Sequence, residues 1–351
     1  MSKAKIKTLD GQALPERIED VTHLEELLST PTDGLVKDFA KLDGDIMVLG
    51  VGGKVGPTLA MMAKRAAPSK RVYGAARFSD AAVRRRLEKA GIECLSCELL
   101  DRAQVEKLPE VKNVVFMAGK KFGTAGLEPY TWAMNVVVPT YVGERFAASR
   151  IVAFSTLCVY PFADVRGPGC DEQNPALPFG DYANSCVGRE RVFQYFSEKN
   201  KSAGRLIRLN YAIDLRYGVL HDIAQWVLKG EPVPLATPVV NVIWQGDATA
   251  QILRALCHTT QPTTPLNIGM PQPAVVKHVA NRFGELLGKR VHFGGVEQTT
   301  AWHNDCSQAR RLFGDPMVDL DTMIRWNVDW LKRGRPVYTK PTHYEERQGT
   351  F

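Results

Sequence analysis

A glycine-rich segment carries the clearest chemical signal in the sequence. It lies between the apolar run 46–49 and a helical pattern that begins near Pro57. Its residues are Gly50, Val51, Gly52, Gly53, Lys54, Val55 and Gly56. The first glycine permits a tight turn, a middle glycine lets backbone approach a pyrophosphate, and the last allows close helix–strand packing. The helix N-terminus adds N–H donors and a partial positive charge. The segment therefore predicts a dinucleotide-binding loop.

The end of the next apolar run bears on the choice of dinucleotide. In NAD-binding proteins an acidic residue about 20 residues past the loop holds the ribose hydroxyls. Here Ala76 stands in that place and Arg77 follows it. A guanidinium suits a 2′-phosphate, so we expect NADP in preference to NAD. The alternative is a surface arginine with no part in cofactor binding.

Other residue pairs that could do chemistry have simpler explanations. Cys94 and Cys97 share a predicted strand, where residues three apart face opposite sides, so we interpret them as structural cysteines. His303 near Asp305 has no partner pair in the sequence, and we expect no metal site. The seven cysteines are odd in number and scattered, which does not indicate a disulfide framework.

Composition and charge exclude several classes of protein. The 351 residues are 44% hydrophobic and 24% charged, which is typical of a globular chain and rules out a disordered one. The net charge of +7 is gathered at Arg84–Arg86 and Lys332–Arg335, both at helical patterns without interleaved aromatic residues. We interpret both clusters as solvated helix faces and expect no nucleic-acid partner. Binding of a small anionic molecule explains the mild excess of positive charge equally well. No apolar run approaches the roughly 20 residues that span a bilayer, so we expect a soluble, cytoplasmic protein without a membrane partner.

The glycine loop needs a strand and a helix to hold it, and the sequence predicts both within a larger alternation. We expect strands at 46–49, 71–75, 93–96, 113–117 and 150–154, and helices at 79–90 and 130–148. Strands that are apolar throughout and separated by helices indicate a parallel sheet covered on both faces. The predicted fold is α/β, a Rossmann-type doubly wound parallel sheet with a smaller C-terminal substrate lobe.

The expected domain organisation follows a change in sequence pattern, from alternating apolar runs and helical segments to an irregular region rich in proline. Residues 1–42 form an N-terminal extension with a short helix after Thr22, and 43–205 form the dinucleotide-binding domain. Residues 206–335, richer in proline, form most of a substrate-binding lobe, with a helix at about 247–257 returning to the first domain. Residues 336–351 are a tail.

From about residue 43 to 335 the chain resembles the extended short-chain dehydrogenase/reductases, also called the NAD-dependent epimerase/dehydratase family. Gly50–Gly56 matches its glycine loop, Cys97–Asp101 the segment that contacts adenine, and Met117–Gly119 the segment beneath the cofactor. The resemblance places these residues against the cofactor, beside the loop and Arg77: Glu98, Leu99, Met117, Ala118, Gly119, Asn135, Tyr182 and Cys186. It also implies a homodimer formed through helices at about 130–148 and 182–199.

The resemblance also implies a catalytic group, with one departure. Tyr182 matches the family's proton-transferring tyrosine and Thr156 the hydroxyl residue that binds the same substrate oxygen. The family places a lysine four residues after the tyrosine, where this chain has Cys186. Free tyrosine has a pKa near 10 and is a poor base at neutral pH without a nearby cation. Either Lys120 or Lys121 supplies that cation, or the usual proton transfer is lost or replaced.

The expected function is therefore NAD(P)-dependent hydride transfer at a hydroxyl or keto group of a sugar or sugar acid, as an oxidoreductase or epimerase. Dehydration is not expected, because Leu157 and Cys158 stand where dehydratases of the family carry Asp and Glu. The connection after Asn210 is short, which favours a small substrate with polar contacts from Asn210, Arg216, His221 and Asp222. The alternative function is a dinucleotide-binding sensor or scaffold with little turnover.

Overall fold

A computed structural model describes residues 6–121, 123 and 126–349 of the chain. Its centre is a seven-stranded sheet in the order β12-β7-β5-β4-β1-β2-β3, in which every pairing is parallel. The strands are β1 (Ile46–Leu49), β2 (Val72–Ala76), β3 (Glu93–Ser96), β4 (Asn113–Phe116), β5 (Arg150–Thr156), β7 (Gly204–Leu209) and β12 (Thr264–Ile268). The predicted doubly wound parallel sheet is confirmed.

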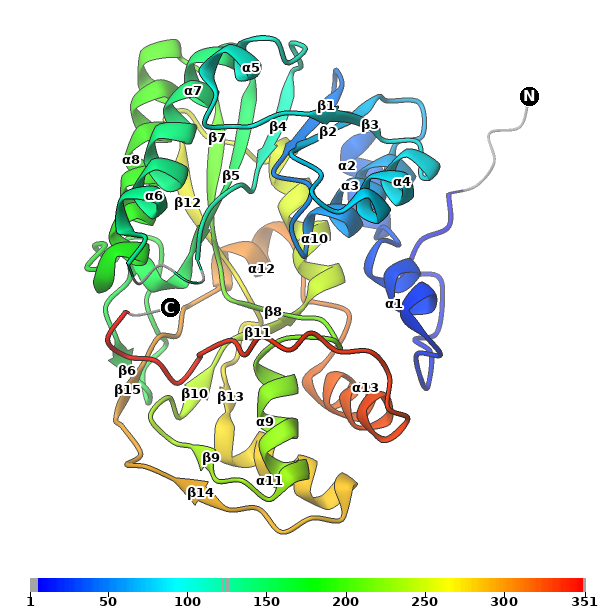
Figure 1. Cartoon of the computed structure of the whole chain (residues 1–351), viewed down its shortest axis with the longest axis vertical. Coiled ribbons are helices and arrows are strands. Elements are labelled where there is room, and N and C mark those ends of the chain that lie inside the picture. The colour runs from blue at the N-terminus through cyan, green and yellow to red at the C-terminus, as the bar shows by residue number, and fades with distance from the viewer. Residues whose placement is uncertain (1–5, 122, 124–125, 350–351) are drawn as a thin grey trace.

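Helices cover both faces of the sheet (Figure 1). One face packs against α2 (Asp33–Phe39), α3 (Gly56–Ala66), α4 (Ala81–Lys89) and α10 (Gln245–Arg254). The other packs against α5 (Arg102–Glu106), α7 (Val138–Arg145) and α8 (Gly180–Asn200). All four residues of β1 and of β4 are buried, because both faces of these central strands are covered.

The predicted helix 130–148 has a different form in the structure. It begins earlier, as α6 (Glu128–Trp132), passes through a π-helical turn at Ala133–Val137, and ends in α7 at Arg145. Single π turns inside helices are frequent at functional sites. Here the turn contains Asn135, whose buried side chain bonds to two neighbouring segments. A periodicity argument alone does not predict such a turn.

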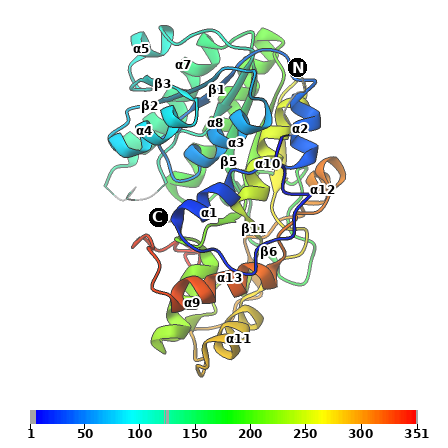
Figure 2. The same cartoon turned by 90° about the vertical axis from the view of Figure 1, so that its right-hand side faces the viewer.

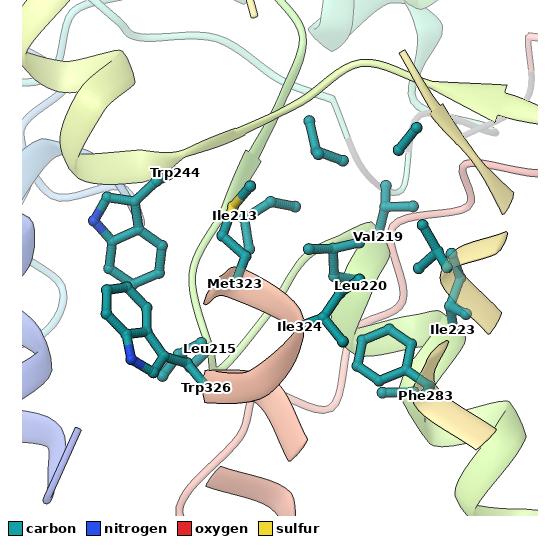
Figure 3. Close-up of a cluster of buried hydrophobic side chains, with 14 of the residues drawn as sticks. Ile213, Leu215, Val219, Leu220, Ile223, Trp244, Phe283, Met323, Ile324 and Trp326 are labelled. Carbon is teal, nitrogen blue, oxygen red and sulfur yellow. The ribbon is translucent and has the colours of Figure 1, made fainter. Parts of the chain in front are cut away.

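A smaller lobe lies below the carboxyl ends of the strands (Figure 1). Its helices are α9 (Val219–Lys229), α11 (Val276–Leu287) and α13 (Leu320–Lys332), and α12 (Ser307–Phe313) lies close to β12. Its strands form short pairs: β8 (Tyr211–Ile213) with β11 (Val242–Trp244), β9 (Val233–Pro234) with β14 (Phe293–Gly294), β10 (Val239–Val240) with β13 (Ala274–Val275), and β6 (Ala163–Asp164) with β15 (Thr300–Ala301). Figure 3 shows its core, where the rings of Trp244 and Trp326 pack edge to face with their centroids 5.2 Å apart.

The first part of the chain packs against both lobes. Helix α1 (Val21–Leu28) contributes Leu24 and Leu28 to the core of the smaller lobe, while Leu35 and Phe39 of α2 enter the core of the sheet. Figures 1 and 2 place α1 at the boundary between the lobes. The helix that we expected after Thr22 is present, but its cap is Asp20, whose carboxylate accepts a hydrogen bond from the backbone N–H of His23.

A buried ion pair fixes α8 on the sheet. The Glu190 carboxylate accepts hydrogen bonds from Arg208 Nε at 3.0 Å and Nη2 at 2.7 Å, on β7. It also accepts one from Ser155 Oγ at 2.6 Å, on β5. The side chains of Glu190 and Arg208 are 1% and 6% exposed, so water screens the pair little. The helix is therefore tied to two neighbouring strands at one point.

We predict that Glu190→Gln lowers the free energy of unfolding by about 3–5 kcal/mol, because it leaves the Arg208 guanidinium buried without a countercharge. Urea unfolding followed by circular dichroism measures the change. The matched control is Glu106→Gln, which breaks the exposed pair with Arg102 and should cost less than about 1 kcal/mol. Equal effects of the two substitutions would contradict the prediction.

Candidate active site

The glycine loop connects β1 to α3, and its glycines have separate roles. Gly50 has φ +86°, and a Cβ there would lie 2.7 Å from the backbone nitrogen of Ala118. A Cβ at Gly56 would run into the carbonyl oxygen of Val51. At Gly52 and Gly53 the nearest atoms to such a Cβ are 3.4 and 3.6 Å away. The outer glycines are thus required by the fold, while the middle ones keep the surface of the loop open to a ligand.

A groove of about 290 Å³ runs along this loop and across the carboxyl ends of β2 and β4. The predicted cofactor residues that line it are Gly50, Gly52, Gly53, Arg77, Glu98, Leu99, Met117, Ala118 and Gly119. No side chain caps the amino end of α3, where a phosphate would meet backbone N–H groups. The residues present therefore fit a dinucleotide, while Lys54, Val55 and Gly56 of the loop do not line the groove.

Arg77 lies in this groove beside an acidic residue. Its Nη1 is 3.5 Å from Glu98 Oε2, and its side chain is 64% exposed. The other oxygen of Glu98 accepts a hydrogen bond from the backbone N–H of Leu100 at 3.1 Å. Arg77 is thus free to turn toward a ligand phosphate at the small cost of a solvated ion pair.

Thr156 and Tyr182 meet at the carboxyl end of β5. Thr156 is the last residue of the strand, Tyr182 lies in the first turn of α8, and the nearby Thr156 hydroxyl lowers the pKa of Tyr182 against the larger effect of burial. Burial raises the pKa of Tyr182 well above 10, so the phenol holds its proton at neutral pH. Both residues line a cavity of about 240 Å³ that shares Met117–Gly119 with the groove.

Cys186 lies one helical turn after Tyr182 and is fully buried. Burial raises the pKa of its thiol to about 11. At neutral pH the side chain is therefore uncharged. It neither supplies a cation to the tyrosine nor places a thiolate beside it.

Both lysines that we considered as replacements line the cavity. Lys121 is near the tyrosine, with Nζ 5.9 Å from the centre of the Tyr182 ring. The backbone of Lys120 is held by Asn135, whose Oδ1 accepts from the Lys120 N–H at 3.0 Å and whose Nδ2 donates to the Lys120 carbonyl at 3.1 Å. Asn135 itself is fully buried and does not line the groove. Its hydrogen bonds hold the Lys120 backbone, which follows the segment Met117–Gly119 at the floor of the groove.

Sequence reasoning missed Arg189, which also lines the cavity. Its side chain is buried, its Nη1 donates to the Phe154 carbonyl at 2.9 Å, and its Nη2 donates to Asn135 Oδ1. A signal was present in the sequence, because residues 182, 186 and 189 fall on one face of a helix. That signal could have identified Arg189 as a cation near the tyrosine.

The structure separates the four expected substrate residues. Asp222 does not line the cavity, and its carboxylate accepts hydrogen bonds from Thr342. Asn210 lines the cavity with Tyr182 and donates from Nδ2 to the Ile268 carbonyl at 3.0 Å. Arg216 is not among the lining residues, because its guanidinium is paired with Asp214 at 2.6 Å and Glu25 at 3.0 Å. His221 is buried away from this cavity, and burial lowers its pKa to about 4, so its ring is neutral.

Lys54 of the glycine loop reaches toward the smaller lobe. Its Nζ lies 3.2 Å from the centre of the Tyr217 ring, a cation–π contact. Burial lowers the pKa of Lys54 to about 8, and repulsion from Lys340 and Lys121 adds to the shift. Three lysines from three different segments therefore share one electrostatic environment.

The chain after α13 runs along the boundary between the lobes (Figure 1). The backbone N–H of Thr342 donates to Asp222 Oδ2 at 2.8 Å, and Arg347 Nη1 donates to the Thr300 carbonyl at 2.7 Å. The expected tail is thus attached at several points along this boundary.

A larger hollow of about 1030 Å³ lies at the amino edge of the sheet. Its charged residues neutralise one another, with Arg150 2.6 Å from Asp43 and Arg145 2.9 Å from Glu110. Open parallel sheets bind ligands at the carboxyl ends of their strands. We therefore assign the site to the two smaller hollows at that edge.

Comparison with solved structures identifies the fold. A dTDP-glucose 4,6-dehydratase from Bacillus anthracis, solved with NAD, is 15% identical, with a TM-score of 0.69 over 82% of this chain and 96% of its own. A UDP-glucose 4-epimerase from Thermotoga maritima, solved with UDP-glucose, is 16% identical, with a TM-score of 0.67 over 83% of this chain and 99% of its own. A UDP-glucuronic acid 4-epimerase from Bacillus cereus, solved with UDP-glucuronic acid and NAD, is 15% identical, with a TM-score of 0.66 over 82% and 99%.

At these identities the likeness establishes a shared fold. The shared fold agrees with the architecture that the resemblance to the epimerase/dehydratase family implies. No protein-family model matches the sequence, and a search of curated proteins found no match either. No helix within the described residues is long and apolar enough to cross a membrane.

Proposed function

We propose that the protein is an NAD(P)-dependent oxidoreductase or epimerase that acts on a hydroxyl or keto group of a sugar or sugar acid. The observation that carries the proposal is that Thr156 and Tyr182 line one cavity, which shares the floor Met117–Gly119 with the glycine-loop groove. The fold shared with sugar-nucleotide epimerases and a dehydratase supports it.

In this proposal each residue has one task. A bound nicotinamide dinucleotide supplies the hydride acceptor or donor. Gly52 and Gly53 leave room for its phosphates, and Thr156 donates a hydrogen bond to the reacting substrate oxygen. Tyr182 transfers the proton to or from that oxygen. Because Tyr182 is protonated at neutral pH, it serves readily as the acid when a keto group is reduced.

We predict that Tyr182→Phe lowers kcat by about 100-fold or more, because it removes the proton donor. The dissociation constant of the dinucleotide should change less than about threefold, since the ring keeps its packing. Absorbance at 340 nm with a panel of sugars and sugar acids measures turnover, and fluorescence titration measures binding. Thr156→Val should lower kcat in the same way and by less.

The same experiment separates the enzyme from a dinucleotide-binding scaffold. The scaffold is favoured by one observation, the neutral Cys186 beside a tyrosine of raised pKa. Tight dinucleotide binding by the wild type without any change at 340 nm across the panel would support the scaffold and contradict the enzyme.

We infer a preference for NADP from Arg77. Arg77→Ser should weaken NADPH binding by about 10-fold or more, because a charge-assisted hydrogen bond to the 2′-phosphate is worth about 1.5–3 kcal/mol. NADH binding should not change. Glu98→Gln is the matched variant: it frees Arg77 from its pair and should strengthen NADPH binding. Equal effects of Arg77→Ser on both dinucleotides would contradict the inference.

The lysines at the boundary between the lobes favour a substrate with an anionic group, such as a sugar acid. Lys340 and Lys121 both repel Lys54, so a carboxylate bound beside Lys54 would offset that repulsion. The cavity of about 240 Å³ suits a small substrate.

We predict that the KM for an anionic substrate rises as pH passes above about 8, the pKa of Lys54, because the lysine loses its charge there. Steady-state kinetics between pH 6.5 and 9.5 measure this dependence. Lys54→Arg should hold KM level across the range, since guanidinium stays charged. Lys54→Met should raise KM by about 10-fold at low pH and remove most of the dependence. A pH profile of KM that is identical in Lys54→Met and wild type would contradict the prediction.

A homodimer through the helix that comprises α6, the π-helical turn and α7, together with α8, remains part of the proposal. These elements expose apolar side chains, including Trp132 at 38%, Val137 at 39% and Tyr195 at 57%. Apolar groups gathered on neighbouring helices are typical of a surface that another chain covers.

A further inference from the structure

Arg189 is a buried cation without a countercharge. Its side chain is 5% exposed, and none of the ion pairs among the described residues includes it. Its Nη groups donate to a carbonyl oxygen and to the amide oxygen of Asn135, both of which are neutral, and its Nε has no hydrogen-bond partner. The adjacent carboxylate of Glu190 is used by Arg208 and Ser155.

Such a charge is costly to the fold. The effective penalty of burying an ion is several kcal/mol, and a carboxylate partner normally offsets it. A structural anchor between Asn135 and the Phe154 carbonyl needs hydrogen-bond donors only, which a neutral side chain supplies at lower cost. The retained positive charge therefore indicates a function for the charge itself.

The position of the guanidinium indicates which function. Tyr182, Cys186 and Arg189 follow one another along one face of α8, and Tyr182 and Arg189 both line the cavity. A Cβ on Gly119 would lie 2.5 Å from Arg189 Nη2, so the guanidinium lies against the floor shared with the cofactor groove. The positive charge of Arg189 lowers the pKa of Tyr182 against the larger, opposite effect of burial.

We propose that Arg189 is the cation of this active site, an electrostatic positioning residue that stabilises negative charge on the Tyr182 oxygen in place of a lysine at position 186. This inference rests on the proposed function. In the oxidative direction the substrate hydroxyl gives its proton to the Tyr182 oxygen and its carbon-bound hydride to the oxidised dinucleotide, which leaves a keto group. Arg189 makes the deprotonated tyrosine accessible for that step.

Lys121 has a different place. Its Nζ lies near the ring of Tyr182 at the cavity and shares the environment of Lys54. We assign it to the anionic group of the substrate, so its loss should act on KM. Loss of Arg189 should act on kcat and on its pH dependence.

The test compares Arg189→Met with the double variant Arg189→Met, Cys186→Lys, which moves the cation one turn nearer on the same helix face. Arg189→Met should lower kcat in the oxidative direction by about 100-fold at pH 7. It should also shift the acidic limb of the kcat profile, where kcat rises as Tyr182 loses its proton, to higher pH by about one unit or more. The double variant should recover at least about 10-fold and return the profile toward that of the wild type. Arg191→Met, an exposed arginine of the same helix, is the control and should leave kcat unchanged.

Circular dichroism and dinucleotide titration accompany each variant. If the wild type is active and Arg189→Met keeps its kcat and pH profile, the inference is overturned and the proposed function stands. If the single and double variants are folded and equally impaired with an unshifted profile, Arg189 is a structural anchor and the inference is again overturned. If the wild type binds no dinucleotide and turns over no substrate, the proposed function itself fails.

Discussion

The site depends on the buried ion pair between Glu190 and Arg208. A long helix that crosses a sheet can slide or rotate unless a specific contact fixes it, and apolar packing alone specifies such a position weakly. Here the carboxylate of α8 is bonded to β7 and, through Ser155, to β5. Because Thr156 follows Ser155 directly and Tyr182 lies on α8, the same contact fixes the position of Thr156 relative to Tyr182, the pair that we propose to be catalytic.

Residues 189 and 190 show how adjacent positions on a helix can have different roles. They differ by about 100° around the axis, so one faces β7 and the other faces the cavity. Glu190 is neutralised and stabilises the fold, whereas Arg189 keeps its charge at the cavity that we propose as the active site. That division makes the neutral thiol of Cys186 compatible with a working tyrosine.

The sequence predicted the sheet and the position of the glycine loop well, because both depend on local pattern. The apolar run 46–49 became β1 without a change of boundary, and Gly50–Gly56 became the strand–helix turn. The role of Arg216 was harder to predict, since its partners Glu25 and Asp214 include a residue 191 positions away. The π-helical turn at Ala133–Val137 and the contacts of Arg189 likewise depend on neighbours that folding alone brings together.

The first helix joins parts of the protein that a two-lobed chain would otherwise leave separate. The carboxylate of Glu25 receives hydrogen bonds from Arg86 of α4 and Arg216 of the smaller lobe, while Leu24 and Leu28 fill the core beside it. A segment shared by two cores makes the loss of either one costly to the other. The lobes should therefore melt together in one cooperative transition rather than as independent units.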